Sequence, residues 1–138
     1  MRGMLFYAHS GIRYLVMLAG LVAVVWLGRA TFQGRPYDRT SKVVMSVFTG
    51  LLDLQILIGL LLLAVIPFYG MLAGHLVMMF AAAFVAHGVV IANRNRPPEK
   101  QSNGLLLAGV VGTLLLVVAG IMAIGRPIFG SSTLGAGM

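Results

Sequence analysis

The sequence predicts an all-α integral membrane protein, folded as a four-helix up-down bundle. Only 9% of its 138 residues are charged and 59% are hydrophobic, whereas a soluble domain carries roughly a quarter charged residues. The apolar residues also gather in four long runs that short polar segments separate. So little polar surface cannot coat a water-soluble fold, and lipid is therefore the expected solvent.

Each apolar run is long enough to cross a bilayer as a helix. A span needs about 20 residues to cross roughly 30 Å of hydrocarbon, and only a helix satisfies its own backbone hydrogen bonds there. The first run is too long for a signal peptide core and is expected to be a retained helix. We expect a single transmembrane domain over residues 1–138, with helices at about 4–28, 43–66, 71–92 and 104–125.

The basic residues predict the orientation of the bundle. Seven of them lie in the first and third connections, whereas the opposite side holds only Arg2 and Arg126. The positive-inside rule places such loops in the cytoplasm. We therefore expect a bacterial cytoplasmic membrane protein with both termini on the outer, periplasmic side. The seven basic loop residues are Arg29, Arg35, Arg39, Lys42, Arg94, Arg96 and Lys100.

Composition and motifs exclude several functions. The chain has no cysteine, which rules out disulfides, thiolate metal sites and cysteine nucleophiles. Its net charge of +7 comes without a basic-aromatic module, so nucleic acid is not an expected partner. Hydrolase, phosphate-loop and zinc-protease motifs are missing from the sequence. No enzymatic activity can be assigned from these features.

Two histidines share a depth near the outer side of the membrane. His9 is the sixth residue of its run and His75 the fifth of its own, which puts both roughly 6–8 Å below the boundary at 1.5 Å per residue. Because the iron of haem b takes one imidazole from each face of the porphyrin, the pair predicts a haem with His9 and His75 as iron ligands. The structural alternative is that His9 sits at the membrane interface and that His75 caps or hydrogen-bonds locally.

The neighbours of these histidines suit a cofactor. Arg13 lies one turn from His9 and could pair with a haem propionate. Met79 lies one turn from His75 on the same face, and a lesser variant is one iron held by a histidine and Met78 or Met79. Gly11 and Gly74 are small enough for a flat macrocycle to approach the backbone.

A second polar site is expected deeper in the membrane. Asp53 and His87 lie at about 21 Å and 24 Å from the outer ends of their runs, so they can form a buried ion pair. Gln55 completes this second polar site, although it lies about 200° from Asp53 around the helix. A structural contact, a quinone headgroup site, a second haem ligand and a proton relay are the alternatives for this level.

Three strings together resemble a known family: HSGIRYLV in the first run, DLQILIGL in the second, and HLVMM with AHG in the third. They are similar to small bacterial four-helix membrane proteins described as cytochrome-b-like, which begin with an HSGxRW-type string. Tyr14 stands where that family tends to have tryptophan, and the fourth run carries no matching motif. The resemblance implies haem, and it draws attention to six positions: His9, Arg13, Gln55, His75, Met79 and His87.

The leading functional hypothesis is a haem-b electron-transfer membrane protein or subunit, possessing a quinone or proton site at the deeper level. The alternative is a cofactor-free accessory subunit of a larger respiratory or photosynthetic membrane complex. A small proton-coupled transporter ranks last, because two hairpins leave little room for alternating access. Expected partners are the lipid bilayer and either other membrane subunits or further copies of this chain.

Overall fold

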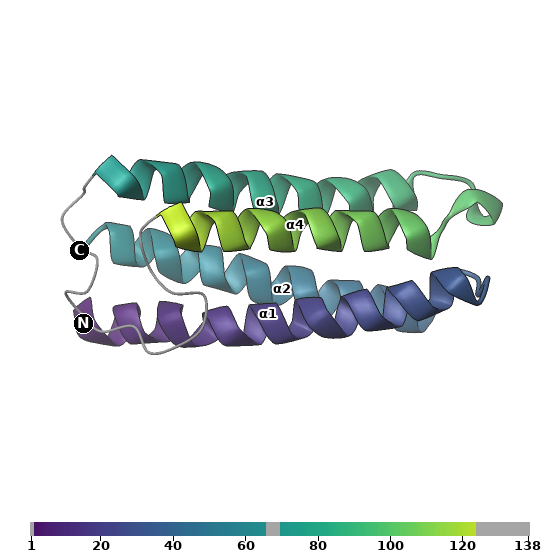
Figure 1. Ribbon diagram of the computed structural model, residues 1–138, viewed down its shortest axis with the longest axis horizontal. Helices are drawn as coiled ribbons and strands as arrows, with labels where there is room; N and C mark the ends of the chain where they lie inside the picture. The colour runs from purple at the N-terminus through teal and green to yellow at the C-terminus, as the bar shows by residue number, and fades with distance from the viewer. Residues whose placement is uncertain (1, 66–69, 124–138) are drawn as a thin grey trace.

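The computed structural model describes residues 2–65 and 70–123 of the chain (Figure 1). Within these residues, four long helices run up and down in turn, and the 33–38 and 95–102 connections lie at the same end (Figure 1). A short 3-10 turn, η1, interrupts the second of these connections. The elements are α1 (Arg2–Phe32), α2 (Arg39–Leu63), α3 (Gly70–Arg94), η1 (Pro98–Lys100) and α4 (Asn103–Ala123).

The turn between α1 and α2 follows from local sequence chemistry. Gly34 has a φ of +66°, a left-handed conformation that glycine adopts without a Cβ clash. Its N–H donates to the Thr31 carbonyl at 3.2 Å, and the Arg35 N–H donates to the Ala30 carbonyl at 2.8 Å, which together form a Schellman motif. The side chain of Asp38 then accepts from the Ser41 N–H at 3.1 Å and caps the start of α2.

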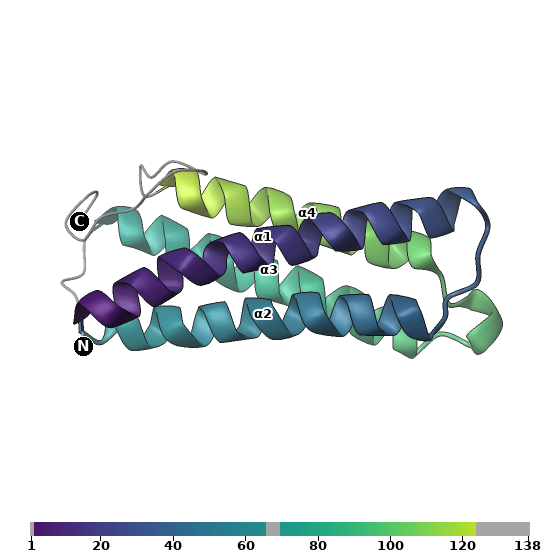
Figure 2. The same ribbon diagram turned by 90° about the horizontal axis from the view of Figure 1, so that it is seen from below.

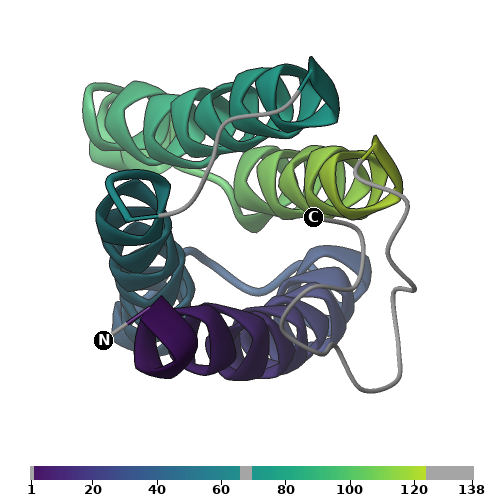
Figure 3. The same cartoon turned by 90° about the vertical axis from the view of Figure 1, so that its left-hand side faces the viewer.

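The helices pack as a ring in chain order. Neighbouring pairs are α1–α2, α2–α3, α3–α4 and α4–α1, so α1 lies diagonally opposite α3 (Figure 3). Seen from below, α1 crosses the bundle obliquely between α2 and α4 (Figure 2). The centre is filled by fully buried side chains that include Leu27, Phe48, Leu52 and Leu106.

A polar network ties α4 to the first connection. The Ser41 hydroxyl donates to the Asn103 side-chain oxygen at 2.6 Å, and the Trp26 indole N–H donates to Ser41 at 3.2 Å. The Asn103 amide donates in turn to the Arg35 and Pro36 carbonyls, at 3.1 and 3.3 Å. Asn103 and Ser41 are both buried, so this network satisfies polar groups that water does not reach.

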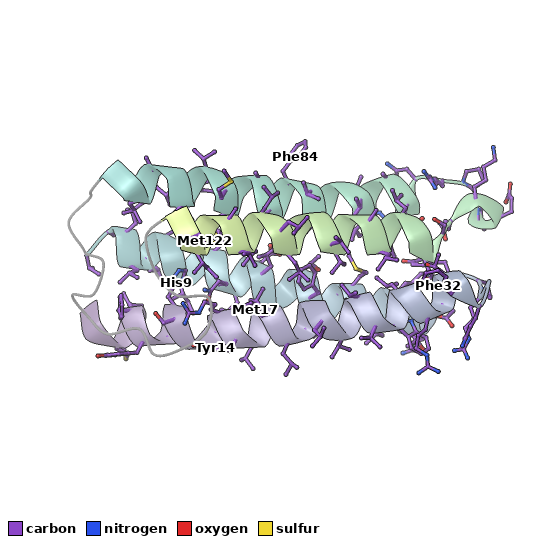
Figure 4. The ribbon with its side chains drawn as sticks, in the orientation of Figure 1. His9, Tyr14, Met17, Phe32, Phe84 and Met122 are labelled. Atoms are coloured by element: carbon purple, nitrogen blue, oxygen red, sulfur yellow. The ribbon has the colours of Figure 1, made fainter. Side chains whose placement is uncertain are left out.

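The outer surface of the bundle is apolar, as a lipid environment requires. All four helices of the described part are long and apolar enough to span a membrane. Large hydrophobic side chains such as Leu18, Leu57 and Val77 are more than half exposed, and Phe84 points away from the bundle (Figure 4). This surface would be costly in water, so the chain is an integral membrane protein whose helices contact the bilayer.

The expected fold class is confirmed, while the helix bounds differ from the expected ones. α1 extends to Phe32, and α2 begins at Arg39, because the Schellman turn and the Asp38 cap allow polar residues into the helix ends. α2 ends at Leu63, three residues before the expected end. Ile66, Pro67 and residues 124–125 lie outside the described residues.

Glycines let α4 approach its neighbours closely. A Cβ built on Gly109 would lie 2.7 Å from Val89 Cγ1 and 2.9 Å from Val89 Cβ. Valine is branched at Cβ and has one strongly preferred rotamer in a helix, so its side chain cannot turn away. Gly109 is therefore a close-packing position between α3 and α4.

We expect Gly109→Ala to lower the free energy of unfolding by about 1–3 kcal/mol through overpacking. Thermal unfolding in mild detergent, followed by circular dichroism, measures this loss. Gly88→Ala is the matched control, because a Cβ at Gly88 meets nothing within 4 Å and alanine favours helix by about 0.5–1 kcal/mol. Equal destabilisation by both variants would contradict the close-packing role of Gly109.

Candidate functional site

The structure brings His9 and His75 together between diagonal helices. Their ring centroids lie 6.2 Å apart and the ring planes meet at 82°. His9 points into the bundle from α1 (Figure 4), and His75, on α3, is 8% exposed. The depths inferred from the sequence thus correspond to a contact in space, while the binding of iron stays a prediction.

Each histidine is held by a backbone carbonyl of a neighbouring helix. His9 Nδ1 lies 3.2 Å from the Gln55 carbonyl oxygen on α2, and His75 Nδ1 lies 2.9 Å from the Gly120 carbonyl oxygen on α4. A carbonyl only accepts hydrogen bonds, so Nδ1 carries the proton in both rings. In the neutral imidazoles, Nε2 is then the nitrogen with the lone pair.

Gln55 belongs with His9 rather than with Asp53. Its side-chain Nε2 donates to the His9 carbonyl at 2.7 Å, which makes the contact between the two residues reciprocal. Its Oε1 is buried and has no hydrogen-bond partner among the described residues. Gln55 was expected to complete the deeper polar site, but the 200° between it and Asp53 turns one inward and the other outward.

These residues line a cavity of about 100 Å³ near the end of the bundle where α1 begins. Contributions come from all four described helices, so the cavity lies on the axis of the bundle. The lining includes five of the six positions to which the family resemblance draws attention, and its remaining members are mostly leucine, valine, isoleucine and phenylalanine. The five are His9, Arg13, Gln55, His75 and Met79.

Arg13 places a cation at this cavity. The residue is 6% exposed, and its Nη2 donates to the Tyr14 hydroxyl at 2.9 Å. The guanidinium carbon also lies 4.7 Å from the centre of the Tyr14 ring. A guanidinium forms strong charge-assisted hydrogen bonds with anionic groups, and no aspartate or glutamate stands among the described residues that line the cavity.

Two glycines that the sequence did not single out for the site make room in it, Gly59 for the His9 ring and Gly120 for Met79. A Cβ on Gly59 would lie 2.9 Å from His9 Cε1, and a Cβ on Gly120 would meet Met79 and lie 3.6 Å from His75 Nδ1. Gly59 comes four residues after Gln55, and this helical spacing could have placed it on the same face.

Gly11 and Gly74, which were expected to admit a macrocycle, instead lie on the exposed faces of α1 and α3. Gly11 is two residues, about 200°, from both His9 and Arg13, and Gly74 is about 100° from His75. A Cβ on Gly11 would meet nothing within 4 Å. Neither glycine therefore faces the cavity.

Asp53 and His87 meet as expected, but on the outside of the bundle. His87 Nε2 donates to Asp53 Oδ1 at 2.7 Å, and the two side chains are 43% and 53% exposed. The sequence predicted a buried pair. Because Phe48, Leu52 and Gln55 take the inward face of α2, Asp53 is left facing away from the core.

No protein-family model, curated protein or solved structure matches the chain significantly. The four apolar helices therefore establish a four-span membrane protein, and the arrangement of its own side chains carries any further inference. Among the described residues, no group of three or more histidine and carboxylate side chains forms a metal site.

A double-mutant cycle on Asp53→Leu and His87→Leu tests whether the outer pair joins α2 to α3. We expect each single variant to cost stability and the double variant to cost less than their sum, because the double leaves no unpaired polar group. The coupling energy should be about 0.6 kcal/mol and at most about 1.7 kcal/mol, as for polar pairs between other membrane helices. Strictly additive losses in detergent unfolding would show that the pair contributes nothing.

Proposed function

We propose that this protein binds haem b between His9 and His75 and transfers electrons within a bacterial cytoplasmic membrane. The separation of the two imidazoles is the observation that carries the proposal. Metal–nitrogen bonds are about 2.0–2.1 Å long, so two imidazoles on opposite sides of one metal have their centroids about 6 Å apart. The observed separation is 6.2 Å.

The hydrogen bonds of the two rings support ligation through Nε2. Metal-binding histidines usually donate their other N–H to a carbonyl or carboxylate, which sets the tautomer and the ring orientation. His9 and His75 both lie within hydrogen-bonding distance of a carbonyl through Nδ1. When bound, haem b supplies one-electron transfer at its iron, while these bonds keep the rings in place.

The surroundings support a planar anionic cofactor. Gly59 and Gly120, on α2 and α4, leave room for the His9 ring and for Met79. The buried guanidinium of Arg13 can pair with a propionate, as charge-assisted bonds to carboxylates are strong. The cavity of about 100 Å³ is smaller than the roughly 300–1,000 Å³ of ligand pockets, so Met79, which is flexible, would have to move.

A cofactor-free accessory subunit is the second candidate, and the outer pair favours it. Asp53 and His87 expose polar atoms within the membrane-spanning parts of α2 and α3, where lipid offers them no partner. Another membrane subunit or a further copy of the chain could cover them, and a quinone headgroup could do the same. In this case the bonds of His9, Gln55 and His75 act only as links between helices.

Purified protein should show a Soret band and a pyridine haemochrome spectrum of haem b with about one haem per chain. His9→Ala and His75→Ala should each lower haem content at least tenfold by removing one iron ligand, whereas His87→Ala should retain it. All three variants are compared by circular dichroism to establish equal folding.

Haem-free protein from cells supplied with a haem precursor would refute the proposal and favour the cofactor-free subunit. Metal analysis belongs to the same experiment, because imidazole and thioether ligands also suit copper. Copper without haem would likewise refute it, and would assign the cavity to a single ion.

The seven basic residues in and beside the two connections support an orientation with those connections in the cytoplasm and the termini in the periplasm. Because the chain has no native cysteine, Asn95→Cys creates one label site on the exposed part of the second connection. A membrane-impermeant maleimide should label it in inverted vesicles and leave it unlabelled in intact cells. Labelling in intact cells would show that the chain has the opposite orientation.

A further inference from the structure

A second cavity lies at the opposite end of the bundle from the histidines. It measures about 280 Å³ and opens between the start of α2, the end of α3 and the two connections. Two cations, Lys42 and Arg94, line it together with hydroxyl and amide groups and two apolar residues. The remaining lining residues are Tyr37, Met45, Ser46, Thr49, Val90 and Gln101.

The positive charge of this cavity is not neutralised within the described part of the chain. The pair of Asp53 with His87 is the only ion pair found there, so neither Lys42 nor Arg94 has a carboxylate partner. Asp38 lies nearby in sequence, but it caps α2 through the Ser41 N–H. Glu99 lies in η1 and is exposed. Asp53 lies one turn beyond Thr49 and bonds His87.

Contacts with neighbouring groups hold parts of the polar lining in place. Lys42 Nζ lies 5.8 Å from the centre of the Tyr37 ring, a cation–π distance that holds the ammonium at the cavity. Burial raises the pKa of Tyr37 above its usual value of 10.0, against a smaller lowering by a hydrogen bond with Asn93. Gln101 Nε2 donates to the Arg96 carbonyl at 3.3 Å, which fixes the connection beside Arg94.

The position of the cavity indicates that a bound anion would come from a lipid headgroup rather than from solution. Lys42 and Arg94 lie at the ends of the two apolar spans, Arg39–Leu63 and Leu72–Arg94, where the headgroup layer of a bilayer begins. On the membrane side the lining includes the apolar Met45 and Val90 beside the hydroxyl groups of Ser46 and Thr49. Exposed apolar side chains then continue along both helices, with Val47 on α2 and Ile91 on α3.

We propose that this cavity binds the phosphate of an anionic phospholipid. Lys42 and Arg94 pair with the phosphate, since Arg binds it through a planar fork and Lys as a point charge. Ser46 and Tyr37 donate to its oxygens, and the acyl chains follow the apolar surface of α2 and α3. Basic pockets between membrane helices bind anionic headgroups by this chemistry. The proposal is independent of haem at the other end.

The test uses full-length protein in nanodiscs of pure phosphatidylcholine or of phosphatidylcholine with one-quarter phosphatidylglycerol. Wild-type protein should keep one phosphatidylglycerol in native mass spectrometry and melt at a higher temperature in the mixed discs. Lys42→Gln with Arg94→Gln should weaken retention about 30-fold, as expected for two charges near an anionic surface. Arg96→Gln with Lys100→Gln removes the same charge at the same end of the bundle, from the second connection, and should retain the lipid.

Three outcomes would overturn the proposal. Equal loss of bound phosphatidylglycerol in both double variants would mean that the lipid is held by a diffuse electrostatic attraction rather than at a site. The same stabilisation by inorganic phosphate in pure phosphatidylcholine discs would assign the cavity to free phosphate. Retention of the lipid by the Lys42 and Arg94 double variant, with normal circular dichroism, would place the lipid elsewhere.

Discussion

Inside roughly 30 Å of hydrocarbon, a backbone amide finds no water to bond, so each apolar run of this chain closes its own hydrogen bonds as a helix. The same constraint then acts on the side chains that are not apolar. A polar atom in the span needs a partner on another helix, and each such partner joins two helices. Gln55 and His9 join α2 to α1, His75 joins α3 to α4, and His87 joins α3 to α2.

These links have different consequences because they face different ways. His9, Gln55 and His75 turn inward, where they line a small cavity on the axis of the bundle with the cation of Arg13 beside them. Asp53 and His87 turn outward, where both side chains are about half exposed. The inward group of polar side chains suits a cofactor held by the bundle. The outward pair of Asp53 and His87 suits a neighbouring protein or a molecule that arrives through the membrane.

Much of the architecture could be predicted from the sequence because the signals are local. Four apolar runs require four helices, the basic connections share one end, and residues at equal depth on two runs tend to meet. The structure accordingly places His9 beside His75 and Asp53 beside His87. The helix ends were less accurate, since the Schellman turn at Gly34 and the cap at Asp38 extend helices into polar sequence. The predicted inward direction of the Asp53 side chain was wrong for another reason. The depth of a residue in the membrane does not determine which way its side chain points around the helix axis.

The sequence by itself determined that this chain spans a membrane four times, where its charge gathers and which polar residues lie within the spans. Each of these properties depends on composition along one run and on the thickness of a bilayer. Only the tertiary structure decided which face of each helix turns inward, because packing against neighbouring helices sets the rotation of each helix about its own axis. It paired Gln55 with His9 and brought Gly59 and Gly120 to the histidines. It also brought Lys42 and Arg94, which are 52 residues apart in the sequence, to the lining of one cavity.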